Sequence, residues 1–386
     1  MDVKQPGSRL VRNVAVVGAG ITGLSVAYFF KKNGDNVTLF EASRSVGGKI
    51  GSIYCEGLEL DLGPITISEN EKIRQLALEL GLEIMEASNA SSIRYIYSGK
   101  KLHRVGPMLI ASSLLSFGGK MSMLKAPLMA AAREDESVAA YTSRRFGSQA
   151  YRRLFNPMMN GIYAGNSELI HARSVLKKRG PRKIISFKGG VAALANGLAN
   201  KLGDSIKLNT PINDIRQLDG FDEIHLTTPA YVTANLVKEL SEPLKSIHHS
   251  SLSQIFCEVM PGVKKFEGFG FLVPSEEKLS LLGAVCVSNI FASKAREGRS
   301  LFVLFCGGDR PYPFTPSVDD TLKEFNSILQ PAVTKVLHVQ EYKNGIPQFY
   351  VGHEKIIDQI RQFEKANPRI KIAGNYLTGV AVGDCL

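Results

Sequence analysis

Val14-Ala15-Val16-Val17-Gly18-Ala19-Gly20-Ile21-Thr22-Gly23, near the start of the 386-residue chain, decides the fold. The four apolar residues predict a buried parallel strand, and the pattern that continues to residue 32 predicts a helix. The glycines between them have the spacing G-x-G-x-x-G. The first permits a tight turn, the second lets a phosphate approach the backbone, and the third lets helix and strand pack closely. We therefore predict a dinucleotide-binding βαβ unit.

The second half of this unit follows directly. Val37 to Phe40 predicts the next strand, and Glu41 stands at its carboxyl end, eighteen residues after Gly23. An acid at this position accepts hydrogen bonds from ribose hydroxyls, while the helix N-terminus offers N–H groups to phosphates. The unit by itself leaves NAD and FAD as alternatives.

The composition of the chain limits the classes of partner that it can bind. The net charge of +11 favours an anionic partner. The densest basic run, residues 173–188, has no aromatic interleaving or helix-turn-helix beside it, so we expect a solvated loop and no nucleic acid. Five cysteines without a C-x-x-C pair and seven histidines without ligand spacing predict reduced thiols, no metal and a cytoplasmic protein.

Two apolar stretches, residues 14–30 and 105–119, are shorter than the ~20 residues of a membrane-spanning helix. We therefore expect no integral membrane protein. Residues 108–132 carry apolar faces together with Lys120 and Lys125, which fits a core-facing helical lobe or a peripheral membrane surface. The core-facing interpretation is preferred here.

The remaining patterns predict elements of both kinds. Helices are expected at residues 69–82, 108–153 and 191–203, and a hairpin at 93–102. Strands are expected near Ile206 and Ile215 and at residues 224–228, 255–260, 281–287, 301–305 and 370–373. Dinucleotide-type elements thus occur at both ends of the chain and near its middle, which predicts interleaved domains.

A basic double-glycine segment, Arg44-Ser45-Val46-Gly47-Gly48-Lys49, comes just after Glu41. It resembles the second signature of the FAD-dependent amine oxidase superfamily, in which glycines let the chain pass close to the cofactor and a cation meets its phosphates. Lys49 replaces the usual arginine, keeping the charge but losing bidentate geometry. This resemblance favours FAD over NAD.

Seven further segments occur in the order found in the oxygen-dependent protoporphyrinogen oxidase family, which the chain resembles from Val14 to Cys385. They are Leu62-Gly63-Pro64, R94-Y-I-Y-S-G-K-K-L, F155-N-P-M-M-N-G-I-Y-A-G165, S186-F-K-G-G190, G268-F-G-F-L-V-P274, G345-I-P-Q-F and G374-N-Y-L-T-G-V-A-V-G-D-C385. Between Arg173 and Ser186 the family usually has a longer helical insertion, so we expect a more open pocket here.

The resemblance implies a non-covalent FAD enzyme that oxidises protoporphyrinogen IX to protoporphyrin IX in heme biosynthesis, with oxygen as electron acceptor. It implies that Arg94 binds a substrate propionate and that Phe269, Gly270 and Leu272 enclose the macrocycle. No catalytic acid or base is nominated, because conjugation gained in the product drives hydride loss. The implied cofactor-binding residues are Gly18, Ala19, Gly20, Ile21, Thr22, Gly23, Glu41, Ala42, Gly47, Gly48, Lys49, Gly63, Pro64, Ile65, Thr66, Ile212, Val380, Ala381 and Val382.

The expected fold class is α/β, with a Rossmann-type FAD-binding domain interleaved with a sheet-rich substrate domain and a helical lobe that is a candidate for membrane binding. The expected boundaries are 10–67, 186–232 and 340–386 for the FAD-binding domain, 68–104 and 233–339 for the substrate domain, and 105–185 for the lobe.

Three alternatives stay open at this point. Coproporphyrinogen III, with four propionates, could be the substrate, and Lys177, Lys178 and Arg179 could serve its extra charge. An amine oxidase or carotenoid-type desaturase would leave Arg94 without an evident purpose. A non-catalytic carrier on the same fold would have no need for Glu41 and the paired glycines. The sequence predicts no oligomeric state.

Overall fold

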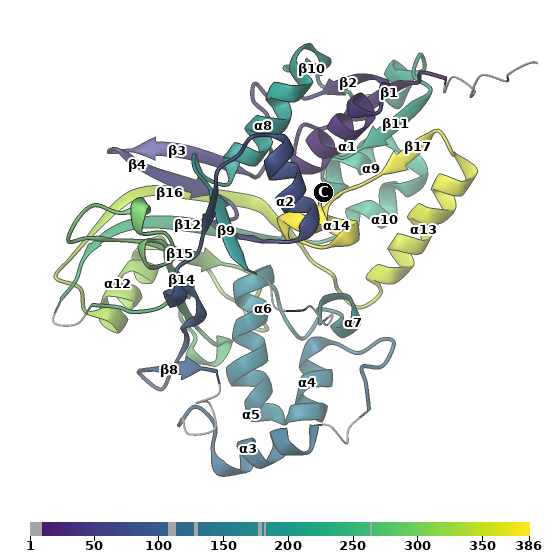
Figure 1. The fold of residues 1–386 in the computed structure, drawn as a ribbon. Helices are drawn as coiled ribbons and strands as arrows, with labels where there is room; N and C mark the ends of the chain where they lie inside the picture. The colour runs from purple at the N-terminus through teal and green to yellow at the C-terminus, as the bar shows by residue number, and fades with distance from the viewer. Residues whose placement is uncertain (1–9, 107–112, 127–129, 177–179, 181–182, 263–264) are drawn as a thin grey trace, which may run out of the picture.

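The computed structural model describes residues 10–106, 113–126, 130–176, 180, 183–262 and 265–386. Figure 1 shows a parallel sheet with its helices, a larger and mainly antiparallel sheet, and a helical lobe. This confirms the predicted α/β class with interleaved parts. Lys177, Lys178 and Arg179, considered above for a second substrate, lie outside the described residues.

The parallel sheet has the strand order β10-β2-β1-β11-β17. It is assembled from distant segments: β1 (Asn13–Val17), β2 (Asn36–Phe40), β10 (Ile206–Lys207), β11 (Glu223–Leu226) and β17 (Ile370–Ile372). Each neighbouring pair is parallel, with β1 between β2 and β11. The order places the carboxyl ends of β1 and β2 together, where ligands bind in open α/β sheets.

Helices cover both faces of this sheet because its strands are apolar on both sides. Val14 and Val16 pack against α1 (Ile21–Lys32), α2 (Glu71–Glu79) and α8 (Ala192–Leu202). Ala15 and Val17 pack on the other side against α9 (Ala230–Leu236), α10 (Ser241–Lys245), α13 (His353–Ala366) and α14 (Asn375–Thr378). Each fully buried Val or Leu stabilises this arrangement by about 1.5–3 kcal/mol.

The larger sheet has the order β16-β12-β15-β14-β13-β7-β8 and is antiparallel except between β13 and β7. Its strands are β7 (Arg94–Ser98), β8 (Lys101–Val105), β12 (His249–Met260), β13 (Gly270–Leu272), β14 (Leu281–Cys286), β15 (Ser300–Gly307) and β16 (Val333–Pro347). Helix α12 (Val318–Leu329) covers one face through Phe325. The hairpin of β3 (Gly51–Cys55) and β4 (Leu58–Leu62) covers the other through Leu58 and Leu60.

A small antiparallel sheet, β5-β9-β6, lies beside the parallel sheet. It consists of β5 (Ile67–Ser68), β6 (Ile84–Glu86) and β9 (Ile184–Phe187). Ile67, Ile185 and Phe187 join the same apolar core as β1 and α1. Strand β9 therefore brings the chain back from the lobe to the dinucleotide-binding part.

The lobe contains α3 (Phe117–Leu124), α4 (Val138–Phe146), α5 (Ser148–Ala150), a π-helical turn at Tyr151–Phe155, α6 (Asn156–Tyr163) and α7 (Ala172–Val175). It extends downward in Figure 1, away from the parallel sheet. Its core includes Val138, Met159 and Phe349, so it is anchored on the chain that follows β16. None of the described helices is both long and apolar enough to cross a membrane.

Several expected elements differ in detail. The helix predicted at 69–82 is shorter, because Asn70 caps it by accepting a hydrogen bond from the Ile73 N–H at 2.9 Å. The strand predicted near Ile215 is wrong. Residues 215–218 form a 3₁₀ turn, closed by a capping box between Asp214 and Gln217. These short polar contacts outweigh the strand preference of an isolated isoleucine.

The expected domain boundaries fall inside structural units. Residue 340 lies within β16, which stays in the larger sheet as far as Pro347. Helix α2, expected in the substrate domain, packs with β1 and α1. Leu240, Leu244 and Ile247, also expected there, belong to the core around Ala15 and Val17. Packing of apolar faces, which composition does not reveal, places these segments with the parallel sheet.

Candidate cofactor and substrate cavity

One cavity of about 1100 Å³ is lined by residues from the parallel sheet, the larger sheet and the lobe. Every residue that the sequence nominates for cofactor or substrate lines it, except Ala19 and Gly23. Gly18, Glu41 and Gly48 belong to its dinucleotide-type end, while Arg94, Phe269 and Leu272 come from the larger sheet. That these residues bind cofactor and substrate stays a prediction, but the fold gathers them around one space.

The glycines form a cradle at the carboxyl end of β1. Gly20 precedes the first turn of α1, and a Cβ added to it would meet nothing within 4 Å. A Cβ on Gly23 would lie 1.8 Å from the carbonyl oxygen of Gly18, so Gly23 permits the close packing of helix on strand. A Cβ on Gly48 would lie 3.1 Å from the Cα of Gly20. The two glycine segments leave bare backbone and a helix N-terminus facing the cavity, which suits a pyrophosphate.

Glu41 lies at the end of β2 and also lines the cavity. One carboxylate oxygen accepts the N–H of Ala19 at 2.7 Å, and the other accepts the N–H of Ser43 at 2.8 Å. These bonds fix the carboxylate, and each oxygen keeps a further lone pair for a hydroxyl. The ribose of a dinucleotide therefore fits here without displacing Glu41. Ala19 itself is fully buried, and it contributes through its N–H.

Lys49 lines the cavity, and the phosphate contact that the signature implies for it stays a prediction. Its ammonium donates hydrogen bonds to the backbone carbonyls of Asn344 and Gly345, each at 2.5 Å, at the end of β16. Burial lowers the pKa of Lys49 to about 8. Among the described residues no carboxylate neutralises this cation, so an anionic group in the adjoining cavity would find an unpaired positive charge.

Arg94 begins β7, and its guanidinium carbon lies 4.9 Å from the centre of the Phe269 ring. Burial lowers the pKa of Arg94, and within the described part of the chain it has no acidic partner. The parallel pairing of β7 and β13 places Arg94 opposite Gly270. A Cβ on Gly270 would lie 2.1 Å from the carbonyl oxygen of Ala284. Strand β13 can therefore approach β14 this closely only with glycine at residue 270.

Sequence reasoning missed several polar residues of the cavity. Gln254 and Tyr342 come from β12 and β16, and Asn160 comes from α6. Asn160 is buried and donates a hydrogen bond to the Ser275 hydroxyl at 3.1 Å. A polar residue inside an apolar strand, such as Gln254 before Ile255-Phe256-Cys257, was the available signal.

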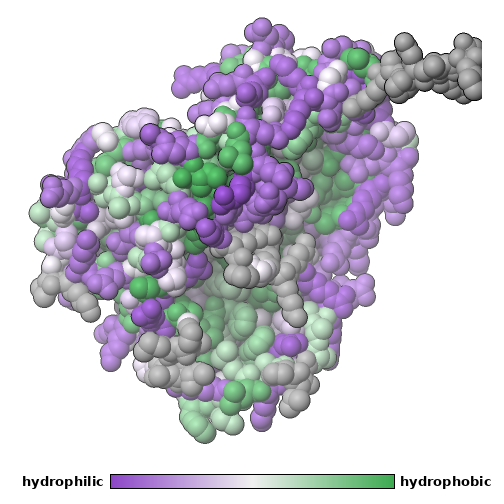
Figure 2. Space-filling view, in the orientation of Figure 1, coloured by the Kyte–Doolittle hydropathy of each residue, from purple (hydrophilic) through white to green (hydrophobic). Residues whose placement is uncertain are grey.

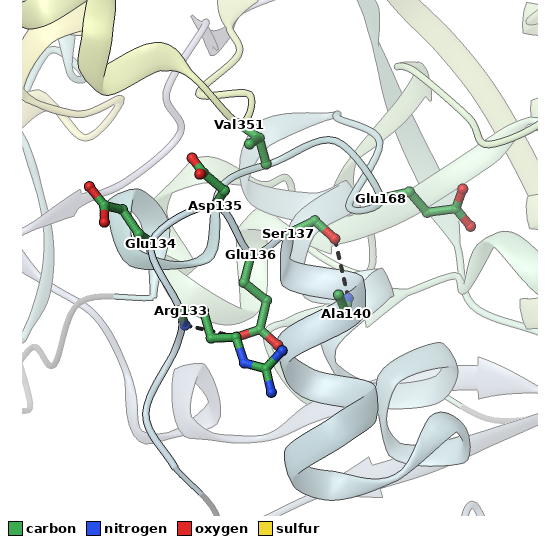
Figure 3. Close-up of a pocket in the computed structure, with 8 residues that line it drawn as sticks. All are labelled: Arg133, Glu134, Asp135, Glu136, Ser137, Ala140, Glu168 and Val351. Atoms are coloured by element: carbon green, nitrogen blue, oxygen red, sulfur yellow. Dashed lines mark hydrogen bonds between the residues drawn. The ribbon is translucent and has the colours of Figure 1, made fainter.

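A second depression of about 640 Å³ lies on the lobe. Figure 3 shows its lining: Arg133, Glu134, Asp135, Glu136, Ser137, Ala140, Glu168 and Val351. Glu136 pairs with Arg144 at 2.8 Å and accepts the N–H of Arg133, and Ser137 caps α4 through the N–H of Ala140. These polar groups stabilise the lobe itself, so we place the functional site in the larger cavity.

Curated relatives match along nearly the whole chain. Protoporphyrinogen oxidase, mitochondrial, from Nicotiana tabacum is 27% identical, covering 97% of this chain and 92% of the relative. Protoporphyrinogen oxidase 1, chloroplastic, from Spinacia oleracea is 24% identical, covering 97% and 82%. Coproporphyrinogen III oxidase from Bacillus subtilis is 24% identical, covering 97% and 96%.

Solved structures share the fold. A provisionally named protoporphyrinogen oxidase from Exiguobacterium sp. 255-15 superposes with a TM-score of 0.81 at 21% identity, covering 97% of this chain and 96% of that one. A fatty acid isomerase from P. acnes has a TM-score of 0.73 at 15% identity, covering 97% and 96%. The fold thus carries more than one chemistry. The model of the family described as flavin containing amine oxidoreductase matches residues 21–386, and the chain belongs to this family of FAD-dependent oxidoreductases.

Proposed function

We propose that the protein oxidises protoporphyrinogen IX to protoporphyrin IX in heme biosynthesis, with oxygen as electron acceptor. The observation that carries the proposal is the position of Arg94. It is a cation that lies on an aromatic ring and lines the same cavity as the dinucleotide-type glycines. A large apolar substrate with a peripheral carboxylate would neutralise it while filling the apolar part of the cavity.

The walls of the cavity support a macrocyclic substrate. Apolar side chains from three parts of the fold line it near Arg94: Ile96, Phe155, Met158, Ile162, Leu272, Val285 and Phe305. Its volume lies above the ~300–1000 Å³ of ordinary small-molecule pockets. We propose that these walls hold the ring system while Arg94 pairs with a propionate by charge-assisted hydrogen bonds.

When bound, FAD supplies two-electron acceptance from carbon. Conversion of a porphyrinogen to a porphyrin removes six electrons and six protons, so three rounds reduce three molecules of oxygen to hydrogen peroxide. The chain's own contribution is orientation and exclusion of water, because the aromaticity gained in the product drives the reaction. No side chain is assigned as an acid or base.

Coproporphyrinogen III is the second candidate substrate. Relatives from Bacillus subtilis and Staphylococcus aureus, 24% and 26% identical, are coproporphyrinogen III oxidases. Among the residues that the structure describes, the cavity lining contains two cations, Arg94 and Lys49, and of these Arg94 comes from the larger sheet. A single described cation on that sheet fits the two propionates of protoporphyrinogen better than four, which is why we rank protoporphyrinogen first.

The deciding experiment mixes the FAD-loaded protein anaerobically with each porphyrinogen and follows the flavin absorbance. We expect rapid bleaching with protoporphyrinogen, slower bleaching with coproporphyrinogen, and recovery of the absorbance with hydrogen peroxide release when oxygen is admitted. The reverse preference would assign the earlier substrate. FAD binding without reduction by either compound would favour a non-catalytic carrier and contradict the proposal.

We also propose a peripheral membrane contact through α3. Helix α3 has no buried residue. Phe117 is 81% exposed and Leu124 is 68% exposed, with Lys120 and Lys125 beside them. Figure 2 shows hydrophobic residues at the lower end of the molecule, where Figure 1 places α3. Apolar side chains flanked by lysines suit an anionic lipid surface.

Sedimentation with vesicles tests this contact. The protein is expected to bind vesicles that contain phosphatidylserine more strongly than neutral ones, and Phe117→Ser with Leu124→Ser is expected to release it. The matched control is Tyr54→Ser, which removes another exposed aromatic residue, on β3 away from the lobe. Equal binding by both variants would exclude α3 as the contact.

A further inference from the structure

Gln254 is a buried polar side chain in the middle of β12, directly before three apolar residues. It stands on β12, between β16 and β15, and is 1% exposed. Its neighbours Ile255, Phe256 and Cys257 are buried apolar residues. Burying a primary amide costs free energy unless each polar atom finds a partner. The hydrogen-bond partners of this amide therefore indicate its role.

The amide pairs with both polar groups of one residue, Gly63. Gln254 Oε1 accepts the N–H of Gly63 at 2.8 Å, and Gln254 Nε2 donates to the carbonyl oxygen of Gly63 at 2.7 Å. Gly63 comes just after β4, whose pairing with β3 ends at Leu62. The side chain of Gln254 thus satisfies both backbone groups of Gly63, as a neighbouring strand would, and joins two parts of the fold.

Gly63 is confined on its other side as well. It has φ +84, and a Cβ there would lie 2.1 Å from the carbonyl oxygen of Lys49. The segment that starts at Gly63 continues through Pro64, Ile65 and Thr66, all of which line the cavity. Gln254 therefore fixes the point at which the cavity-lining segment 63–66 leaves the β3–β4 hairpin.

Tyr342 on β16 completes the contact. Its hydroxyl donates to Gln254 Oε1 at 3.3 Å, and burial raises the pKa of Tyr342 to about 12, so the phenol stays a donor near neutral pH. Lys49, through Asn344 and Gly345, makes a second tie from the glycine segments to the same strand. Both ties join the dinucleotide-type side of the cavity to the larger sheet, which also carries Arg94.

We propose that Gln254 is a positioning residue. It holds segment 63–66, and with it the flavin, in register with the sheet that holds the substrate. The positioning of the flavin rests on the family's FAD cofactor. The alignment with the substrate rests on the proposed function. Hydride transfer depends steeply on the separation of the reacting atoms, and a displacement of ~1 Å can cost about 10²-fold in rate.

Two substitutions test the proposal. Gln254→Leu removes both bonds to Gly63 and is expected to lower the limiting rate of anaerobic flavin reduction by about 10²-fold, with little change in the substrate dissociation constant. Gln254→Glu makes the hydrogen bonds to Gly63 depend on pH. A buried carboxyl has a raised pKa, and its protonated form can donate to Gly63 as the amide does. Its reduction rate, divided by the wild-type rate, should rise as pH falls from 9 to 6.

Gln340→Leu is the matched control for the rate, because Gln340 lies opposite Gln254 on β16 and donates to the carbonyl oxygen of Glu341 instead of Gly63. Its rate is expected to stay within a few-fold of the wild type. Tyr342→Phe removes the hydroxyl and leaves the Gly63 pair intact, and it serves as the control for hydrogen exchange. A Gln254→Leu protein with the wild-type limiting rate, or a Gln254→Glu rate ratio that is independent of pH, would overturn the proposal. If Gln254→Leu does not fold, the pH dependence of Gln254→Glu decides alone.

Hydrogen exchange provides a readout that needs neither substrate nor turnover. In the FAD-loaded protein, the peptide covering residues 58–66 should lose protection in Gln254→Leu but keep it in Tyr342→Phe. Unchanged protection in Gln254→Leu would refute the positioning role. If the wild-type flavin is reduced by neither porphyrinogen, the proposed function fails, and exchange still decides whether Gln254 holds this segment.

Discussion

The guanidinium of Arg94 lies over the ring of Phe269, 4.9 Å from its centre, in a cavity where its charge meets no described carboxylate. Cation–π contact of this kind contributes about 0.5–2 kcal/mol, and it offsets only part of the cost of the hydration that the cation loses in the cavity. A bound carboxylate would supply the rest. This pair therefore leads to the first prediction.

Arg94→Ala should raise KM for the porphyrinogen by about 10- to 100-fold, because a hydrogen bond to a charged group contributes about 1.5–3 kcal/mol. Limiting kcat should change less, since the propionate lies away from the reacting carbon. The KM of Arg94→Lys, which keeps the charge, should lie between the KM of the wild type and that of Arg94→Ala. Steady-state kinetics check this, and an unchanged KM in Arg94→Ala would remove Arg94 from the site.

Gly20→Ala and Gly23→Ala should separate cofactor binding from folding. A Cβ on Gly20 has open space on the cavity side, so Gly20→Ala should keep the Tm but weaken FAD binding by crowding the pyrophosphate. Gly23→Ala places a methyl 1.8 Å from the Gly18 carbonyl oxygen and should lower the stability itself, by about 1–3 kcal/mol or more. FAD titration and thermal unfolding of the FAD-free protein measure the two effects. Equal loss of Tm in both variants would contradict the assignment.

Lys49 predicts a pH dependence with a definite sign. Its pKa in the folded protein, about 8, lies below the ordinary lysine value of 10.5, so between these two pH values the unfolded chain binds more protons. Stability of the FAD-free protein should therefore gain a contribution as pH rises from 8 to 10.5, and Lys49→Met should lose that contribution. FAD, an anion, should bind more weakly above pH 8. Denaturant titrations at several pH values, with Lys201→Met as an exposed control, would show whether Lys49 is responsible.

A buried ion cluster predicts a large stability effect away from the cavity. Lys294 is 6% exposed, lies 2.8 Å from Glu59 and pairs with Asp61, which also accepts the N–H of Val191. Lys294→Met should cost about 3–5 kcal/mol, because it leaves a buried carboxylate without its cation. Lys335→Met breaks a half-exposed pair with Glu56 and should cost about 0–1 kcal/mol. Urea unfolding compares them, and similar costs would argue against burial as the cause.

The sequence predicted the parts whose signal is local. The β1–α1–β2 unit could be recognised because strand, glycines, helix and Glu41 follow one another within thirty residues. Arg94 and Phe269 were found by resemblance, and the parallel pairing of β7 with β13 brings them together. Helix α13, which follows the G345-I-P-Q-F motif, was not predicted, although its exposed face is strongly charged.

Contacts between distant segments could not be predicted in this way. The Gln254–Gly63 pair joins residues 191 positions apart, and the Lys49 contact with Gly345 spans 296. Such hydrogen bonds depend on how two sheets pack, and they leave no periodic pattern in the chain. The contact of Lys49 with β16 likewise depends on a rotamer that only the packing around this strand determines.

The interleaved strand order has a consequence for biosynthesis. Strand β11, which pairs with β1, ends at residue 226, and β17, which pairs with β11, ends at residue 372. During synthesis the apolar face of β1 that carries Ala15 and Val17 therefore stays uncovered until α9, α10 and α13 have been made. Chaperone capture of nascent chains, and FAD uptake only after these helices have been made, follow from this order of synthesis.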